Sequence, residues 1–100
     1  MRLTNNQILG IRQIASQVTG RSLSSVRVFG SRLDDHATGG DLDLMLELSE
    51  PVDNPLLIAA QMAARTSRIM LGRKVDVLLS APNLMRLPIH DAAFEEGTLL

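Results

Sequence analysis

The chain contains no cysteine, tryptophan or tyrosine, and its only aromatic residues are Phe29 and Phe94. The lack of cysteine excludes disulfide bonds and thiolate metal sites, and it is typical of a protein of the reducing cytosol. With so few aromatic side chains, base stacking is largely excluded as a way of binding nucleic acid. No signal-peptide pattern and no apolar run of about 18 residues is present, so a cytoplasmic location is expected.

Charge and size narrow the class of protein further. The formal net charge is −1, which does not provide the strongly basic surface that nucleic-acid binding usually needs. The 100 residues, 45% hydrophobic and 21% charged, are typical of a soluble globular chain. We therefore expect a single domain over residues 1–100, and nucleic acid is not its expected primary ligand.

Apolar spacing and capping residues predict helices that alternate with strands. The first helix is predicted to begin with Thr4 as N-cap and Gln7 completing a capping box, and to end at Gly20. Strands are predicted over 25–29, 41–48 and 74–79, a second helix over 55–72 with its apolar face at Leu57, Ile58, Met62 and Ile69, and a last helix over 88–96. This order predicts an α/β fold with a small mixed β-sheet packed against helices.

The predicted strand 41–48 carries two carboxylates on one face. Because side chains alternate along a strand, Asp41 and Asp43 point away from the face formed by the leucines between and after them. Carboxylates this close repel each other unless a positive group lies between them, and Mg²⁺ prefers such oxygen ligands. The alternative is an edge strand with one solvated face, but the surrounding leucines are too apolar for a fully wet edge.

Gly30 and Ser31 precede this strand and indicate a phosphate site. A glycine lets the backbone approach a ligand closely, and exposed amides with a hydroxyl can hold phosphate. Taken alone, the pair is more typical of a turn glycine followed by a helix N-cap. Asp76, on the polar face of the predicted strand 74–79, adds a third carboxylate. Three strand aspartates after a Gly-Ser corner together indicate a metal and phosphate site.

This combination resembles the DNA polymerase beta-type nucleotidyltransferases. The resemblance rests on Gly30-Ser31, a nine-residue spacer, Asp41-Leu42-Asp43 and a later Asp76 within Lys-Val-Asp-Val-Leu, and it spans about residues 26–79. The short chain resembles the minimal nucleotidyltransferase (MNT) branch of that superfamily. The chain departs from the pattern at Gly40, where many members have a serine or another polar residue, and its spacer is one residue shorter than in many members.

The resemblance implies a polymerase beta-like nucleotidyltransferase fold and a role for each motif residue. Asp41, Asp43 and Asp76 would be the catalytic residues and would bind two Mg²⁺ ions. Gly30, Ser31 and Arg32 would bind the triphosphate of the nucleotide substrate, which is expected to be ATP. The implied reaction transfers a nucleoside monophosphate, AMP in this case, to a hydroxyl group.

The MNT resemblance also implies a partner. Members are often paired with a helical HEPN protein as antitoxin and toxin, so the expected acceptor is a hydroxyl of a HEPN partner. Two alternatives remain: a non-catalytic module that neutralises a toxin by contact, and an antibiotic-type small-molecule nucleotidyltransferase that needs a partner subunit. The oligomeric state stays open. The partner is expected to dock beside the 31–40 loop and the last helix, at Arg32, Asp34, Asp35, Ile89 and Phe94.

Overall fold

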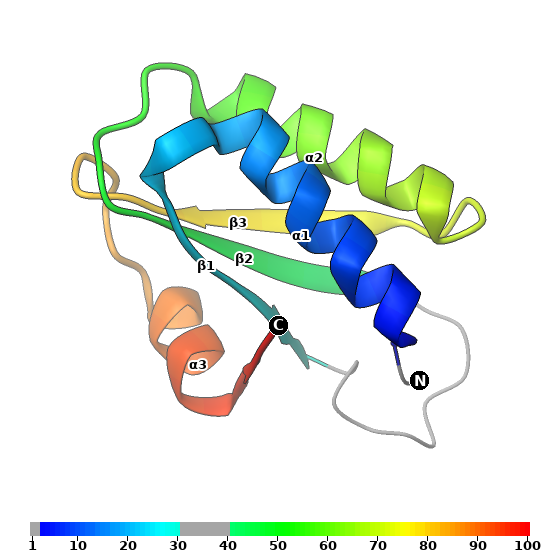
Figure 1. Ribbon diagram of the computed structural model, residues 1–100. Coiled ribbons are helices and arrows are strands. Elements are labelled where there is room, and N and C mark those ends of the chain that lie inside the picture. Colours follow the sequence, from blue (N-terminus) through cyan, green and yellow to red (C-terminus); the bar gives the residue numbers. More distant parts are fainter. Residues whose placement is uncertain (1–2, 31–40) are drawn as a thin grey trace.

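The structure, a computed structural model, describes residues 3–30 and 41–100. Within these ranges one sheet has the strand order β3-β2-β1-β4, with β1 (Leu23–Phe29), β2 (Leu42–Leu48), β3 (Val75–Ser80) and β4 (Thr98–Leu99). The helices are α1 (Asn5–Thr19), the 3₁₀ helix η1 (Gly20–Ser22), α2 (Pro55–Ile69) and α3 (Pro88–Glu96). Figure 1 shows α1 and α2 on one side of the sheet and α3 on the other. The predicted α/β fold with a mixed sheet is confirmed, because β1 and β2 are antiparallel whereas β2 and β3 are parallel.

Capping side chains set the helix starts that the sequence predicted. Thr4 Oγ1 accepts a hydrogen bond from the Gln7 amide at 3.1 Å, and Gln7 Oε1 accepts one from the Thr4 amide at 2.8 Å. Gly20 ends α1 with a φ of +68°, in the left-handed region that favours glycine. At the start of α2, Asn54 Oδ1 accepts a hydrogen bond from the Leu57 amide at 3.3 Å. These local signals place both helices correctly.

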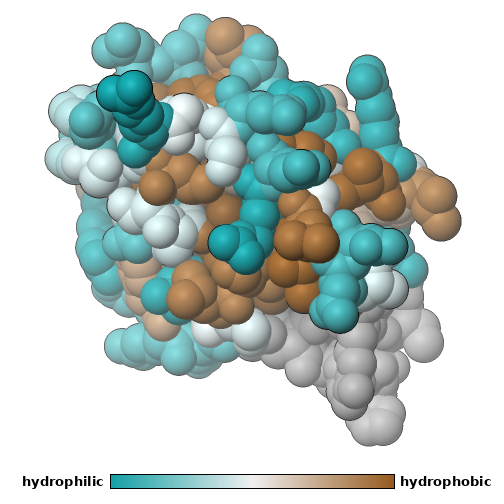
Figure 2. Space-filling view, in the orientation of Figure 1, coloured by the Kyte–Doolittle hydropathy of each residue, from teal (hydrophilic) through white to brown (hydrophobic). Residues whose placement is uncertain are grey.

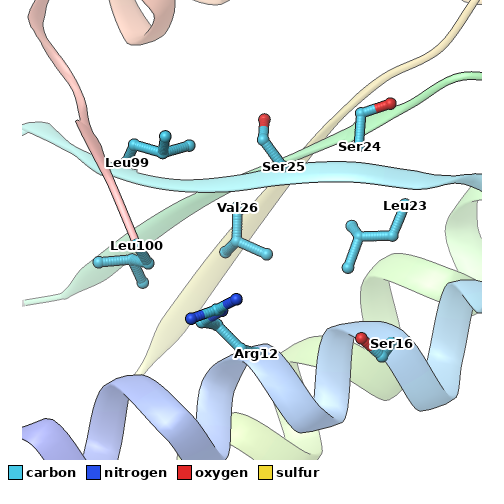
Figure 3. A pocket seen from close by; sticks show the side chains of 8 residues that line it. All are labelled: Arg12, Ser16, Leu23, Ser24, Ser25, Val26, Leu99 and Leu100. Carbon is cyan, nitrogen blue, oxygen red and sulfur yellow. The ribbon is translucent and has the colours of Figure 1, made fainter.

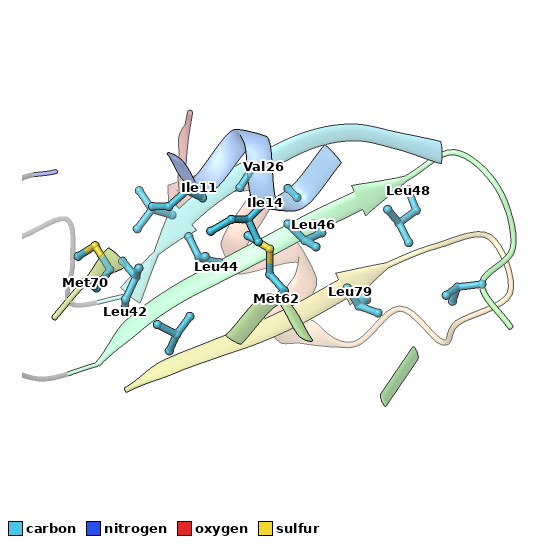
Figure 4. Close-up of a cluster of buried hydrophobic side chains, with 14 residues drawn as sticks. Ile11, Ile14, Val26, Leu42, Leu44, Leu46, Leu48, Met62, Met70 and Leu79 are labelled. Carbon is cyan, nitrogen blue, oxygen red and sulfur yellow. The ribbon is translucent and has the colours of Figure 1, made fainter. Parts of the chain in front are cut away.

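The leucines of β2 form the centre of the hydrophobic core. Leu42, Leu44 and Leu46 are fully buried, and they face α1 and α2. The cluster around them includes Ile11, Ile14, Val26, Met62 and Leu79 (Figure 4). Because β2 lies between β1 and β3, the alternative interpretation of β2 as a solvated edge strand is excluded.

The predicted apolar face of α2 is partly wrong. Met62 is fully buried and Ile58 packs against the core, but Leu57 and Ile69 are 50% and 38% exposed. Thr66 is fully buried instead, one turn after Met62. The prediction counted only apolar residues and so missed Thr66. A threonine is buried when its place on the helix faces the core, although it is not an apolar residue.

His90 attaches α3 to the sheet. The side chain is buried, with Nε2 2.8 Å from the carbonyl oxygen of Leu79 and Nδ1 2.9 Å from the amide of Leu87. Nδ1 must accept from that amide, so Nε2 carries the hydrogen and donates it to the Leu79 carbonyl. His90 therefore has a structural role in this fold.

The chain ends in β4, a strand that the sequence analysis did not predict. Thr98 and Leu99 pair with Val28 and Arg27 in antiparallel register. Two residues are too few to show an alternating pattern, so no sequence signal was available for this strand.

Candidate functional site

The three candidate catalytic aspartates lie at one end of the sheet. The parallel register of β2 and β3 pairs Asp43 with Asp76. Asp41 comes directly before β2 and two residues before Asp43, so strand alternation gives both the same direction. The side chains of Asp41 and Asp76 are 43% and 51% exposed. Parallel pairing thus brings Asp76 to the end of the sheet where Asp41 and Asp43 lie, although it is distant from them in sequence.

Gly30 borders this acidic end from the β1 side. Phe29, the last residue of β1, pairs with Asp43 across the antiparallel ladder. Gly30 has a φ of +73°, and a Cβ atom at this position would lie 2.6 Å from Asp43 Oδ2. The backbone at Gly30 therefore comes close to the Asp43 carboxylate. Contact with a phosphate stays a prediction, and Ser31 and Arg32 lie outside the described residues.

Lys74 lies among the acids and was not assigned a role by the sequence analysis. Its Nζ lies 3.7 Å from Asp41 Oδ2 and 4.0 Å from Asp76 Oδ1. The signal was available, because Lys74 precedes Asp76 by two residues and therefore shares its direction along an alternating strand.

The donor chemistry fits Mg²⁺, although the side-chain arrangement is not that of a loaded site. Three carboxylates supply the hard oxygen ligands that this ion prefers, and its coordination would leave positions for water and phosphate oxygens. Among the residues that the structure describes, however, no three acidic or histidine side chains are grouped so that they could hold a metal ion. The Lys74 ammonium lies between two of these carboxylates, those of Asp41 and Asp76.

A separate groove of about 380 Å³ lies along β1 (Figure 3). It is lined by Arg12 and Ser16 of α1, by residues 23–26 and by the last two residues of the chain. In the close-up, Arg12 extends from α1 toward Val26 and Leu100. None of the three aspartates lines this groove, so it is not part of the acidic site.

The predicted docking face is described only in part. Ile89 is 48% exposed and available for a contact. Phe94 is instead engaged within the molecule, since its ring centroid lies 5.3 Å and 4.6 Å from the guanidinium carbons of Arg27 and Arg86. Arg32, Asp34 and Asp35 lie outside the described residues.

Hydrophobic side chains are scattered among hydrophilic ones on the face shown in Figure 2. Independently of this view, the most exposed large hydrophobic side chains among the described residues are Leu56, Leu71 and Met85. In the ranges that the structure describes, the helices are too short or too polar to cross a membrane.

No family model and no curated protein matches this sequence, whereas solved structures match nearly all of it. A toxin-antitoxin structure with AMP-PNP matches with a TM-score of 0.66 and 16% identity, over 97% of this chain and 72% of that chain. A structure of the tri-AMPylated Shewanella oneidensis HEPN toxin in complex with MNT antitoxin matches with a TM-score of 0.58 and 17% identity, over 93% and 70% of the two chains. A candidate nucleotidyltransferase from Sulfolobus solfataricus matches with a TM-score of 0.54 and 19% identity, over 93% and 80%. The chain therefore has the nucleotidyltransferase fold.

Proposed function

We propose that this protein is a Mg²⁺-dependent nucleotidyltransferase that transfers AMP from ATP to a hydroxyl of a HEPN-type protein partner, as the antitoxin of a toxin-antitoxin pair. The observation that carries the proposal is the parallel register that pairs Asp43 with Asp76, at the end of a nucleotidyltransferase-fold sheet that also bears Asp41. Two matching structures support the choice of nucleotide and partner, since one contains AMP-PNP and another a tri-AMPylated HEPN toxin.

In this proposal the residues of the chain divide into two groups. Asp41, Asp43 and Asp76 hold two Mg²⁺ ions, while Ser31 and Arg32, with the backbone at Gly30, hold the triphosphate. When bound, the metal ions supply activation of the attacking hydroxyl and charge screening at the α-phosphate. The hydroxyl gives its proton to water and its oxygen forms a bond to the α-phosphorus. The bond from that phosphorus to the oxygen between the α- and β-phosphates breaks, and pyrophosphate leaves with the charge that Arg32 offsets.

The acceptor has to be positioned by the partner. The carboxylates of Asp41 and Asp76 are about half exposed at the open end of the sheet, so nothing among the described residues there encloses a second substrate. Positioning of the attacking group supplies a large part of the rate in such reactions. A partner that docks beside residues 31–40 would place its hydroxyl at this end. Ile89 lies toward the other end of β3, next to the His90 that bonds Leu79, so it could contact only a more distant part of such a partner.

The test is a transfer assay with the purified protein, a HEPN partner, Mg²⁺ and ATP labelled at the α-phosphate. We expect label on the partner, loss of label with Asp43→Asn, and no loss with Asp53→Asn, which makes the same change at an exposed residue after β2. A stable complex that never becomes labelled would favour the non-catalytic module. Label on an amino-sugar acceptor but not on protein would favour the small-molecule transferase.

A further inference from the structure

The one lysine of the chain lies where the acids meet. The other nine basic residues are arginines, so Lys74 is the only ammonium side chain in the sequence. Its Nζ lies within 4.0 Å of both Asp41 and Asp76, from two different segments. An ammonium is a compact point charge with three hydrogen-bond donors, whereas the planar guanidinium of arginine is suited to binding one carboxylate through two hydrogen bonds. In size and charge, Lys74 is therefore the side chain that most resembles a metal ion held between two carboxylates.

The backbone keeps Lys74 at this position. Its carbonyl oxygen accepts a hydrogen bond from the Leu42 amide at 3.0 Å, which ties the residue before β3 to the first residue of β2. The side chain itself is 70% exposed, so its ammonium can move into solvent at low cost once the carboxylates acquire another cation. A hydrogen bond therefore holds the backbone of Lys74 in place, whereas only exposed ion pairs hold its ammonium.

We propose that Lys74 is a built-in competitor for the metal: its ammonium is the counterion of Asp41 and Asp76 in the metal-free protein and has to leave before a divalent cation binds. The proposal rests on the metal site of the proposed function. Its consequence is that Lys74 limits metal affinity, so that the carboxylates stay paired when Mg²⁺ is scarce.

The test is a Mg²⁺ titration without nucleotide, followed by the amide resonances of β2 and β3. Exposed ion pairs are weak, so Lys74→Gln, which keeps most of the side-chain length but removes the charge, should bind Mg²⁺ about fivefold more tightly than the natural protein. Lys74→Arg, which keeps the charge, should stay within about twofold of the natural protein. Arg21→Gln removes the same charge from an exposed residue before β1, at the far end of the sheet, and should leave the affinity unchanged.

A second measurement follows the ammonium directly. Reductive methylation with labelled carbon keeps the charge and gives resonances from this single lysine and the terminal amine, which Lys74→Arg distinguishes. We expect the Lys74 resonance to shift when Mg²⁺ is added and, without any metal, when Asp41→Asn removes one of its partners.

Two outcomes would overturn the proposal while leaving the metal site intact. One is unchanged or weaker Mg²⁺ binding by Lys74→Gln. The other is a lysine resonance that shifts neither with Asp41→Asn nor on addition of Mg²⁺. Failure of both the natural protein and Lys74→Gln to bind Mg²⁺ would overturn the metal site together with it. Weaker binding of ATP by Lys74→Gln, with Mg²⁺ affinity unchanged, would make Lys74 a phosphate ligand and also overturn the proposal.

Discussion

Replacing Gly30 by alanine tests whether the end of β1 positions the Asp43 carboxylate. Gly30 has a φ of +73°, and the added Cβ would lie 2.6 Å from Asp43 Oδ2. The left-handed conformation costs an alanine roughly 1–2 kcal/mol, and turning Asp43 away from its preferred rotamer adds roughly 1 kcal/mol. We therefore expect Gly30→Ala to lower the unfolding free energy by about 2–3 kcal/mol, which corresponds to a loss of about 10–20 °C in Tm for a chain of this size.

The larger effect should be on the metal site. The added Cβ atom would displace the Asp43 carboxylate, which is a proposed metal ligand. Gly30→Ala should therefore weaken Mg²⁺ binding by about tenfold or more, because losing a group that orients a metal ligand typically has an effect of this size. Thermal unfolding by circular dichroism and a Mg²⁺ titration measure the two effects separately.

Gly20 provides the matched control. Its φ is +68°, and a Cβ atom there would have nothing within 4 Å, so Gly20→Ala introduces backbone strain without a steric contact. It lies between α1 and β1, at the opposite end of the sheet from Gly30. We expect Gly20→Ala to lower Tm and to leave Mg²⁺ affinity unchanged. If the two variants bind Mg²⁺ equally well, Gly30 does not set the position of the Asp43 oxygen, and the reasoning fails.

Three further predictions concern single side chains. Asp76→Asn should abolish transfer while changing Tm by no more than about 2 °C, because its contact with Lys74 is exposed and 4.0 Å long. His90→Ala should lower the unfolding free energy, measured in urea, by about 2–4 kcal/mol, because it removes two hydrogen bonds of a buried ring. Ile89→Ala, at the exposed neighbouring residue, should lower it by less than about 1 kcal/mol. Thr66→Val should raise the unfolding free energy by about 1 kcal/mol, because Thr66 Oγ1 is buried without a hydrogen-bond partner in the described part of the chain. The control Thr19→Val removes a 2.7 Å hydrogen bond within α1 and should not raise the unfolding free energy.

Each of these predictions has an outcome that would contradict it. Transfer that survives Asp76→Asn would remove this residue from the catalytic set. Equal destabilisation by His90→Ala and Ile89→Ala would show that the buried hydrogen bonds do not hold α3. A loss of stability on Thr66→Val would mean that the hydroxyl has a partner, such as a buried water.

Local elements were predictable because their signals are local. The capping box of Thr4 and Gln7 and the N-cap Asn54 fix helix starts through bonds between residues three apart. The alternation in 41–48 separates the acids from the leucines without any knowledge of neighbouring strands. These features required no tertiary information, and the structure confirms them.

Features that depend on tertiary contacts were harder to predict. Thr66 is buried because α2 packs on the sheet, and its own polarity argues against that position. The pairing of Asp43 with Asp76 depends on strand order and register, which the periodicity of either strand leaves open. The sequence grouped the three aspartates only as strand acids that follow Gly30-Ser31, and the family resemblance then implied that they bind the same metal ions.

The topology explains why the motif residues gather at one end. β2 and β3 are joined through α2 and run parallel, so they begin at the same end of the sheet, and β1, antiparallel to β2, finishes there with Gly30 following it. Parallel strands need a crossover of this kind, and the helix covers the leucine face of β2. The register that places Asp76 is in turn fixed by burial, because a shift of one residue in β3 would expose Val75 and Leu79, each 7% exposed, and turn Asp76 into the core. The apolar residues of β3 therefore determine where its catalytic candidate points.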